Sequence, residues 1–267
     1  MSIKSQKDLL TWASFKNINV CIDQKKILSN INLDLNYGEN TLILGPNGSG
    51  KSTFLQLLNR SIYPINSKNS SFKLFNREQI NIWDIRKKIG FLFKEMEERV
   101  RNDVSLYDLI SSGFSGTFNS RYSKSLTESE KQKVEKLICD WELNNIVLNE
   151  FKSLSDGQRR RALLARALVY EPSILVLDEP FCNLDIKSNL ILNKNLNKLR
   201  QQSKNIIYVT HNLESILPYT NKVILIKEGK IRRIGDPNEL ISSEILSDLF
   251  NISINVIKQN GYWRSLY

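Results

Sequence analysis

The sequence predicts an α/β protein with a parallel core, an N-terminal antiparallel β subdomain and a mostly helical insert. Apolar and polar residues alternate with a period of two before residue 41, as in strands that have one wet face. Further along, short apolar runs alternate with helical patterns, which indicates a parallel α/β core. From about residue 95 to residue 168 helical patterns dominate, and this stretch is the predicted insert.

The first elements are predicted to be strands. Residues 15–20 and 27–35 alternate, and a turn at residues 36–39 follows the second run. Residues 41–44 read Thr-Leu-Ile-Leu without polar alternation, as expected of a central strand that is covered on both faces. The polar stretch at residues 66–71 is expected to be a loop.

The remaining elements follow from the same two periodicities. Apolar runs predict strands at residues 89–93, 172–178 and 205–210. Helices are predicted from Ser105, from the N-cap Thr127 to about Leu143, and over residues 186–202, the last with Ile186, Leu190, Ile191, Leu196 and Leu199 as its apolar residues. Turn dipeptides predict hairpins at residues 222–234, through Glu228-Gly229, and 254–266, through Asn260-Gly261.

Composition excludes several classes of protein. The chain has 267 residues, of which 41% are hydrophobic, so it can bury a substantial core. It contains no apolar run long enough to span a membrane. The net charge of +10 is spread along the chain, which favours a solvated surface or an anionic membrane face over specific nucleic-acid binding. The three cysteines, Cys21, Cys139 and Cys182, are scattered, which is typical of free thiols in a reducing compartment.

A glycine-rich loop lies between the strand at residues 41–44 and a helix. The residues of this loop are Gly45, Pro46, Asn47, Gly48, Ser49, Gly50, Lys51, Ser52 and Thr53. Its glycines let backbone N–H groups approach phosphate oxygens, and the helix start adds partial positive charge. Lys51 supplies a full charge for the β- and γ-phosphates, and the Ser52 hydroxyl can bind Mg²⁺. The strand–loop–helix context favours a nucleoside triphosphate site over an ordinary turn.

Two carboxylates end the apolar strand at residues 172–178. Asp178 at a strand end can hold Mg²⁺, and Glu179 is placed to polarise water for attack on a γ-phosphate. The alternative is a charged pair that merely ends a strand. The phosphate loop upstream favours the catalytic interpretation.

A polar loop, residues 154–158, leads into an arginine-rich helix. Ser155 is the expected N-cap, and the N–H groups at this helix start would suit an anion. The plainer interpretation is a capped surface helix, because within one chain the triphosphate is already bound by the loop that contains Lys51. His211, the only histidine, follows the strand at residues 205–210; a lone histidine there is more often structural.

The set of motifs, in this order and spacing, resembles the ATP-binding cassette (ABC) family over nearly the whole chain. Gly45 to Thr53 match its phosphate loop, and residues 154–158 resemble its signature sequence. Asp178 and Glu179 match the Walker B aspartate and the catalytic glutamate. The D-loop is matched by Asn183-Leu184-Asp185, and His211 matches the histidine that contacts the γ-phosphate.

The resemblance implies a P-loop NTPase (RecA-like) fold and an ATPase that uses ATP and Mg²⁺. It implies a head-to-tail cassette dimer, in which Ser155, Gly157, Gln158 and Asp185 of one chain face the nucleotide held by the other. A single ABC ATPase domain is expected at residues 12–250, with a β-hairpin extension at 251–267. Partners are expected to be separate transmembrane permease subunits, with the chain peripheral on the cytoplasmic face of the membrane.

The tail, residues 235–263, resembles cassettes of the iron-siderophore, cobalamin and molybdate importers, and import is therefore expected. A generic helix and hairpin that cover the core are an equally good interpretation of this tail. The rival function is a soluble, non-transport cassette acting on a cytoplasmic assembly, and a nucleic-acid-binding regulator is a weaker option that rests on the charge alone.

The sequence departs from the family at the positions of Ile22, Lys94 and Asp156. Ile22 stands where an aromatic ring usually stacks on adenine, and Trp12 or Phe15 could replace it. Lys94 stands at the place of the Q-loop glutamine; a lysine has donors only, so Glu95 is the expected metal ligand there. Asp156 replaces a glycine, and Arg159 and Arg160 are expected to offset its charge.

Overall fold

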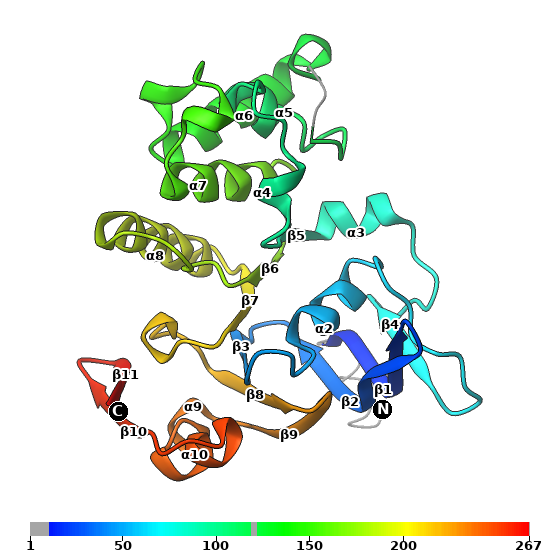
Figure 1. Ribbon diagram of the computed structural model, residues 1–267. Coiled ribbons are helices and arrows are strands. Elements are labelled where there is room, and N and C mark those ends of the chain that lie inside the picture. Colours follow the sequence, from blue (N-terminus) through cyan, green and yellow to red (C-terminus); the bar gives the residue numbers. More distant parts are fainter. Residues whose placement is uncertain (1–10, 119–121, 267) are drawn as a thin grey trace, which may run out of the picture. The chain divides into compact units, whose positions relative to one another are not determined.

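The computed structural model describes residues 11–118 and 122–266 (Figure 1). The chain folds into two compact units. Unit 1 comprises Met1–Ile85 with Asn205–Tyr267, and unit 2 comprises Arg86–Lys204. Helix α3 (Ile82–Lys88) contains the boundary. Both units combine strands with helices, which confirms the predicted α/β class.

An antiparallel sheet opens unit 1. Its strands are β1 (Thr11–Ile22), β2 (Lys25–Asn36) and β4 (Ser71–Leu74), in the order β2-β1-β4. Phe15 of β1 is opposite Phe72 of β4, and their rings stack with centroids 4.6 Å apart. The prediction missed β4, because the polar residues before it hide the short alternation in which Phe72 and Leu74 are buried.

The second sheet of unit 1 carries the phosphate loop. Strand β3 (Thr41–Leu44) lies between β7 (Asn205–Thr210) and β8 (Lys222–Lys227), parallel to both, and β9 (Lys230–Gly235) pairs antiparallel with β8. All residues of β3 and β7 are buried, and the place of β3 between two parallel strands confirms the prediction of a central strand at residues 41–44. Helix α2 (Lys51–Leu58) follows β3 and buries Phe54, Leu55, Leu57 and Leu58.

The C-terminal part of unit 1 consists of short helices and a hairpin. Helices α9 (Pro237–Leu240) and α10 (Ser243–Phe250) follow β9, and α9 contacts both β8 and β9. Strands β10 (Asn255–Gln259) and β11 (Tyr262–Leu266) form the predicted hairpin. Strand β11 contacts the 3₁₀ turn η4 (Leu213–Ser215), which follows β7.

Unit 2 is mostly helical. Its parallel strands β5 (Ile89–Leu92) and β6 (Ile174–Asp178) are separated in sequence by α4 (Met96–Arg99), α5 (Leu106–Ser111), α6 (Glu128–Asp140) and α7 (Asp156–Ala167). The 3₁₀ turns η1 (Tyr122–Ser125), η2 (Asn144–Ile146) and η3 (Phe151–Ser153) connect the helices. Helix α7 contacts α4, α5 and α6 (Figure 1). Thr127 and Glu130 form a capping box at the start of α6, which confirms the predicted N-cap.

Helix α8 (Ile186–Gln201) ends unit 2 and differs from its prediction on one point. Its expected apolar face included Ile186 and Leu190, but these side chains are 83% and 67% exposed. The buried side chains are those of Leu192, Asn195 and Leu196. The helix therefore buries its central part, and the apolar residues of its first turns face solvent in this chain.

The division into a domain at residues 12–250 and an extension at 251–267 stays a prediction. Within residues 11–118 and 122–266, no helix combines the length and the apolar character needed to cross a bilayer.

Candidate functional site

The phosphate loop joins β3 to α2 in unit 1. Its conformation depends on Gly50, the N-cap of α2, which has a left-handed φ of 99°. A Cβ atom at Gly50 would also lie 2.7 Å from Cδ2 of Leu28, so only glycine fits at this position. Ser49 N donates to Pro46 O and Phe54 N to Gly50 O, which closes the turn and begins the helix. The loop thus places the start of a helix, the end that carries partial positive charge, at the end of a buried strand.

Lys51 holds its ammonium group against this loop. The side chain is buried, with 7% of the residue exposed. Nζ donates hydrogen bonds to Gly45 O at 2.8 Å and Pro46 O at 2.9 Å. Asn47, Gly48 and Ser52 are exposed around it, and Thr53 is half-buried. A full positive charge is therefore fixed where a phosphate chain would meet the loop.

His211 lies at the same sheet edge as the phosphate loop. Strands β3 and β7 are parallel, and Leu44 is the register partner of Thr210. Gly45 and His211 therefore leave adjacent strands side by side. The turn after His211 is held by a hydrogen bond from Asn212 N to Thr210 Oγ1, and the imidazole is exposed.

Glu214 is a neighbour of His211 that the sequence analysis missed. Its N–H donates to Oδ1 of Asn212, and its Oε1 accepts hydrogen bonds from both N and Oγ of Ser265 in β11, each 3.0 Å long. The C-terminal hairpin is thus tied to the segment that follows His211. No sequence signal marks a hydrogen bond between residues so far apart.

Asp178 and Glu179 end strand β6 of unit 2. Asp178 is 3% exposed, and Glu179 is half-buried. Glu179 has a φ of 47°, a left-handed conformation that costs about 1–3 kcal/mol for residues other than glycine. Such strain concentrates at functional positions, and here it turns the chain at the point where the catalytic carboxylate is predicted.

Lys94 and Glu95 follow strand β5 beside this point. Strands β5 and β6 are parallel, with Leu92 the register partner of Leu177, so both chains leave the sheet at the same edge. Lys94 and Glu95 are exposed. The backbone therefore brings Glu95 to the edge that carries Asp178.

The predicted signature loop begins helix α7. Ser155 is its N-cap, as predicted: Gln158 N donates to Ser155 Oγ, and Ser155 N donates to Gln158 Oε1. This capping box uses both side chains to fix the helix start. Of the arginines expected to offset Asp156, Arg159 does so, with Nη1 3.8 Å from the carboxylate.

Arg160 is a correction to that expectation. It is buried, and its Nη2 lies 3.3 Å from Oε1 of Glu97 in α4 instead. The cause is the helical period, which turns successive side chains by about 100° and so directs Arg160 into the packed face of α7.

Gly157 packs directly on the start of helix α8. A Cβ atom there would lie 2.1 Å from Oγ and 2.5 Å from Cβ of Ser188, which no side-chain rotation relieves. Asp185 caps α8 by accepting a 2.6 Å hydrogen bond from Ser188 N. Hydrogen bonds from Ser188 lower the pKa of Asp185, so its carboxylate stays charged. The predicted signature and D-loop residues are therefore adjacent within unit 2.

No adenine platform is offered by Trp12 or Phe15. Both are 1% exposed; Phe15 packs on Phe54 and Phe72, and the Trp12 ring lies near Phe75. Neither ring has a free face for a base, so the suggestion that they replace an aromatic residue at position 22 is wrong. Ile22 itself is exposed at the end of β1.

The predicted site residues fall into two sets. Unit 1 carries the phosphate loop and His211, and unit 2 carries Asp178, Glu179, Glu95 and the signature and D-loop residues. Within residues 11–118 and 122–266, no three His, Cys, Asp or Glu side chains gather closely enough to hold a metal ion by themselves.

Comparisons with known proteins identify the family of this chain. Residues 28–182 match the family model described as ABC transporter, which covers more than half of the chain. The ABC transporter ATP-binding protein YmeB of Lactococcus lactis is 29% identical over 252 residues, which cover 92% of this chain and 95% of YmeB.

A second relative and a solved structure extend the comparison. The sulfate/thiosulfate import ATP-binding protein CysA of Pectobacterium atrosepticum is 33% identical over 229 residues, or 84% of this chain; the match spans only 66% of CysA. The structure of cbiO1 from Clostridium perfringens, part of the ABC transporter complex cbiONQ, superposes with a TM-score of 0.73 at 26% identity, over 90% of this chain and 94% of cbiO1.

The resemblance, the P-loop NTPase fold and the ATPase activity expected from the sequence are confirmed. The chain belongs to the ABC transporter family and is one of its ATP-binding, ATP-hydrolysing subunits.

Proposed function

We propose that this chain powers a multi-chain ABC importer, as one member of a head-to-tail cassette dimer bound to separate permease subunits at the cytoplasmic face of the membrane. The start of α7 carries the proposal. It is a capped helix start with the signature residues Ser155 and Gly157, and it lies far from Lys51 in the sequence. A second chain's triphosphate is the anion that this helix start suits. The name of CysA, an import ATP-binding protein, supports import.

In the proposed cycle, ATP is held by the phosphate loop of one chain and by Ser155, Gly157, Gln158 and Asp185 of the other. Glu179 accepts a proton from the attacking water, and His211 contacts the γ-phosphate. Binding of ATP at both sites closes the dimer. Hydrolysis reopens it, because the triphosphate charge that holds the two chains together is then divided between ADP and phosphate. Closure and reopening would drive the permease between its two conformations.

Mg²⁺ fits the oxygen atoms that Ser52 and Asp178 offer. Ser52 offers an exposed hydroxyl in the first turn of α2, and Asp178 offers a carboxylate at the end of β6. Hard oxygen donors in small number suit Mg²⁺, which takes its other ligands from phosphates and water. When bound, the ion would neutralise charge on the β- and γ-phosphates.

We propose that Glu95, not Lys94, takes the metal role of the Q-loop glutamine. Lys94 has no acceptor atom, and Glu95 is an exposed carboxylate beside it. Replacing Glu95 by Ala is expected to raise the Mg²⁺ concentration needed for half-maximal turnover about tenfold, the loss of one ligand in a shared site. Magnesium titrations of the ATPase rate measure this, with Glu98→Ala as control; an unchanged magnesium requirement in Glu95→Ala would rule the role out.

Affinity purification of a tagged Glu179→Gln variant in mild detergent with ATP tests the transport proposal. ATP should trap the closed dimer, so a membrane protein with several spanning segments is expected to be recovered with it. A Lys51→Met variant, impaired in holding ATP, should recover less of the same protein. Recovery of soluble proteins alone would overturn the transport proposal in favour of a non-transport cassette and leave the ATP chemistry unchanged.

A further inference from the structure

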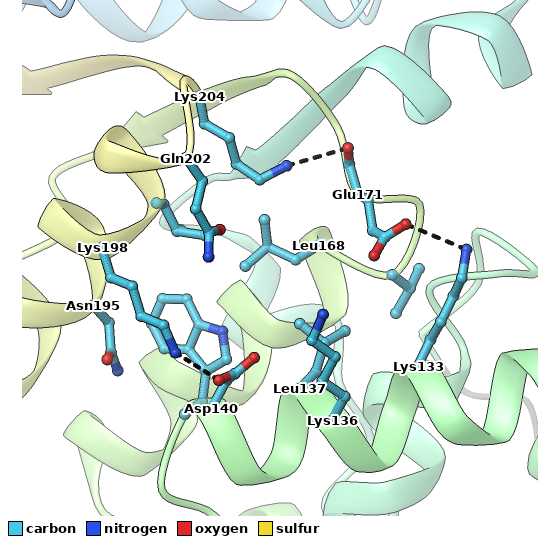
Figure 2. Close-up of a pocket in the computed structure, with 13 residues that line it drawn as sticks. Lys133, Lys136, Leu137, Asp140, Leu168, Glu171, Asn195, Lys198, Gln202 and Lys204 are labelled. Atoms are coloured by element: carbon cyan, nitrogen blue, oxygen red, sulfur yellow. Dashed lines mark hydrogen bonds and ion pairs between the residues drawn. The ribbon is translucent and has the colours of Figure 1, made fainter.

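Unit 2 contains a cavity that plays no part in the ATP chemistry. It has a volume of about 220 Å³ and lies between α6 and α8, beside the segment that follows α7 (Figure 2). Its apolar lining comes from Leu137, Trp141, Leu168, Val169 and Leu199. The space is several times the roughly 30 Å³ that a water molecule occupies in the liquid, so it can take an organic molecule of modest size.

The rim of this cavity is cationic. It carries four lysines and two carboxylates, a net charge of +2: Lys133, Lys136, Lys198 and Lys204 against Asp140 and Glu171. Figure 2 shows two of the lysines turned to carboxylates: Lys198 to Asp140, at 2.7 Å, and Lys133 to Glu171, at 3.5 Å. The excess charge therefore resides on Lys136 and Lys204.

Lys204 and Lys136 form no ion pair with any residue that the structure describes. Lys204 Nζ donates to the backbone oxygens of Glu171 and Pro172, and burial lowers its pKa, against the influence of Glu171. Lys136 is exposed and makes no ion pair within the described part of the chain. An anion at the rim would be attracted by both ammonium groups.

Asn195 is a buried polar residue in the wall of the cavity. The residue is 6% exposed, lines the cavity from α8, and its Nδ2 has no hydrogen-bond partner among the described residues. A buried amide donor without an acceptor lowers stability, and native proteins usually satisfy such groups. Because Nδ2 is itself closed to solvent, a molecule in the cavity would be held by the apolar wall and the cationic rim.

We propose that this cavity is a binding site for a small organic anion with an apolar, preferably aromatic, body, such as an aryl carboxylate. The ring would pack among Leu137, Trp141 and Leu199, and the carboxylate would sit between the excess charges of the rim. The residues all belong to unit 2, and the proposal does not depend on the proposed transport function.

The probe for the test is 2-naphthoate, with the uncharged 2-naphthamide as its matched partner. Titration calorimetry on the whole chain, with ADP present to occupy the nucleotide site, is expected to show saturable one-to-one binding of naphthoate. The amide should bind at least about tenfold more weakly, because it lacks the charge that the rim attracts. Equal affinity for the two probes, or no naphthoate binding up to 10 mM, about the weakest binding that such titrations detect, would overturn the proposal.

Variants locate the binding. Lys136→Glu reverses an exposed charge at the rim and is expected to weaken naphthoate binding about tenfold or more. Lys194→Glu makes the same change of net charge on an exposed residue of α8 that does not line the cavity, and should leave binding unchanged. Equal weakening by Lys136→Glu and Lys194→Glu would show that only net charge matters, and would refute this site.

Discussion

Replacing Glu179 by Gln is expected to lower steady-state ATP turnover by about 10²–10⁴, the usual contribution of general-base catalysis, while ATP binding persists. Glutamine has nearly the same shape as glutamate, so the strained turn at the end of β6 can be kept. The amide cannot take a proton from water at neutral pH, so only the chemical step is lost. Phosphate release measures turnover, and equilibrium binding of labelled ATP measures affinity.

A matched variant separates this loss from a general effect of removing a carboxylate. Glu135 is an exposed glutamate of α6, and Glu135→Gln should turn over ATP at the wild-type rate. Wild-type turnover in Glu179→Gln would instead mean that another group accepts the proton, and Glu179 would have to be assigned a positioning role.

Replacing Lys51 by Met is expected to weaken ATP binding roughly ten- to hundredfold. A hydrogen bond to a charged group contributes about 1.5–3 kcal/mol, and each 1.4 kcal/mol is a factor of ten in affinity. Methionine keeps much of the buried apolar stem but loses the ammonium group that donates to Gly45 O and Pro46 O. The loop thus loses both its charge and part of its internal support. Equilibrium dialysis with labelled ATP gives the dissociation constant.

Lys222 provides the control for Lys51. Its ammonium group also lies in unit 1, with Nζ 2.7 Å from Glu39 and hydrogen-bonded to Asp34 O, but away from the phosphate loop. Lys222→Met should reduce thermal stability and leave the ATP affinity of the folded protein unchanged. If Lys51→Met binds ATP as tightly as the wild type, the phosphates are held by the backbone alone.

Much of this architecture follows from local sequence patterns. The buried strand Thr41–Leu44, the capping box at Thr127 and the hairpin through Asn260-Gly261 each rest on residues a few positions apart, and each is confirmed. Strand β4 was missed because its pairing with β1 depends on residues far away in sequence, and four residues carry little periodicity of their own.

The site was predictable as a set of residues but not as a geometry. Motif spacing named Lys51, Glu179 and Ser155, because each belongs to a short local pattern. The contact of Gly157 with Ser188 and the hydrogen bonds between Glu214 and Ser265 join distant segments, and no local pattern encodes them. Ile186 shows that a local pattern can also mislead. It belongs to a helical pattern of apolar residues, yet its side chain is exposed.

The hairpin that binds Glu214 has a thermodynamic consequence. If the segment after His211 shifts between nucleotide states, the paired hydrogen bonds from Ser265 are stronger in one state than in the other. Coupling of this kind is reciprocal. Docking of the hairpin on the core changes the affinity for nucleotide by some factor, and bound nucleotide changes the affinity of the hairpin for the core by the same factor. Hydrogen exchange at the Ser265 amide, measured with and without ATP, would report this coupling free energy. Identical exchange rates in the two conditions would mean that the coupling free energy is zero. Hydrogen exchange in β11 would then report whether a γ-phosphate is bound, and changes in β11 would in turn alter the affinity for nucleotide.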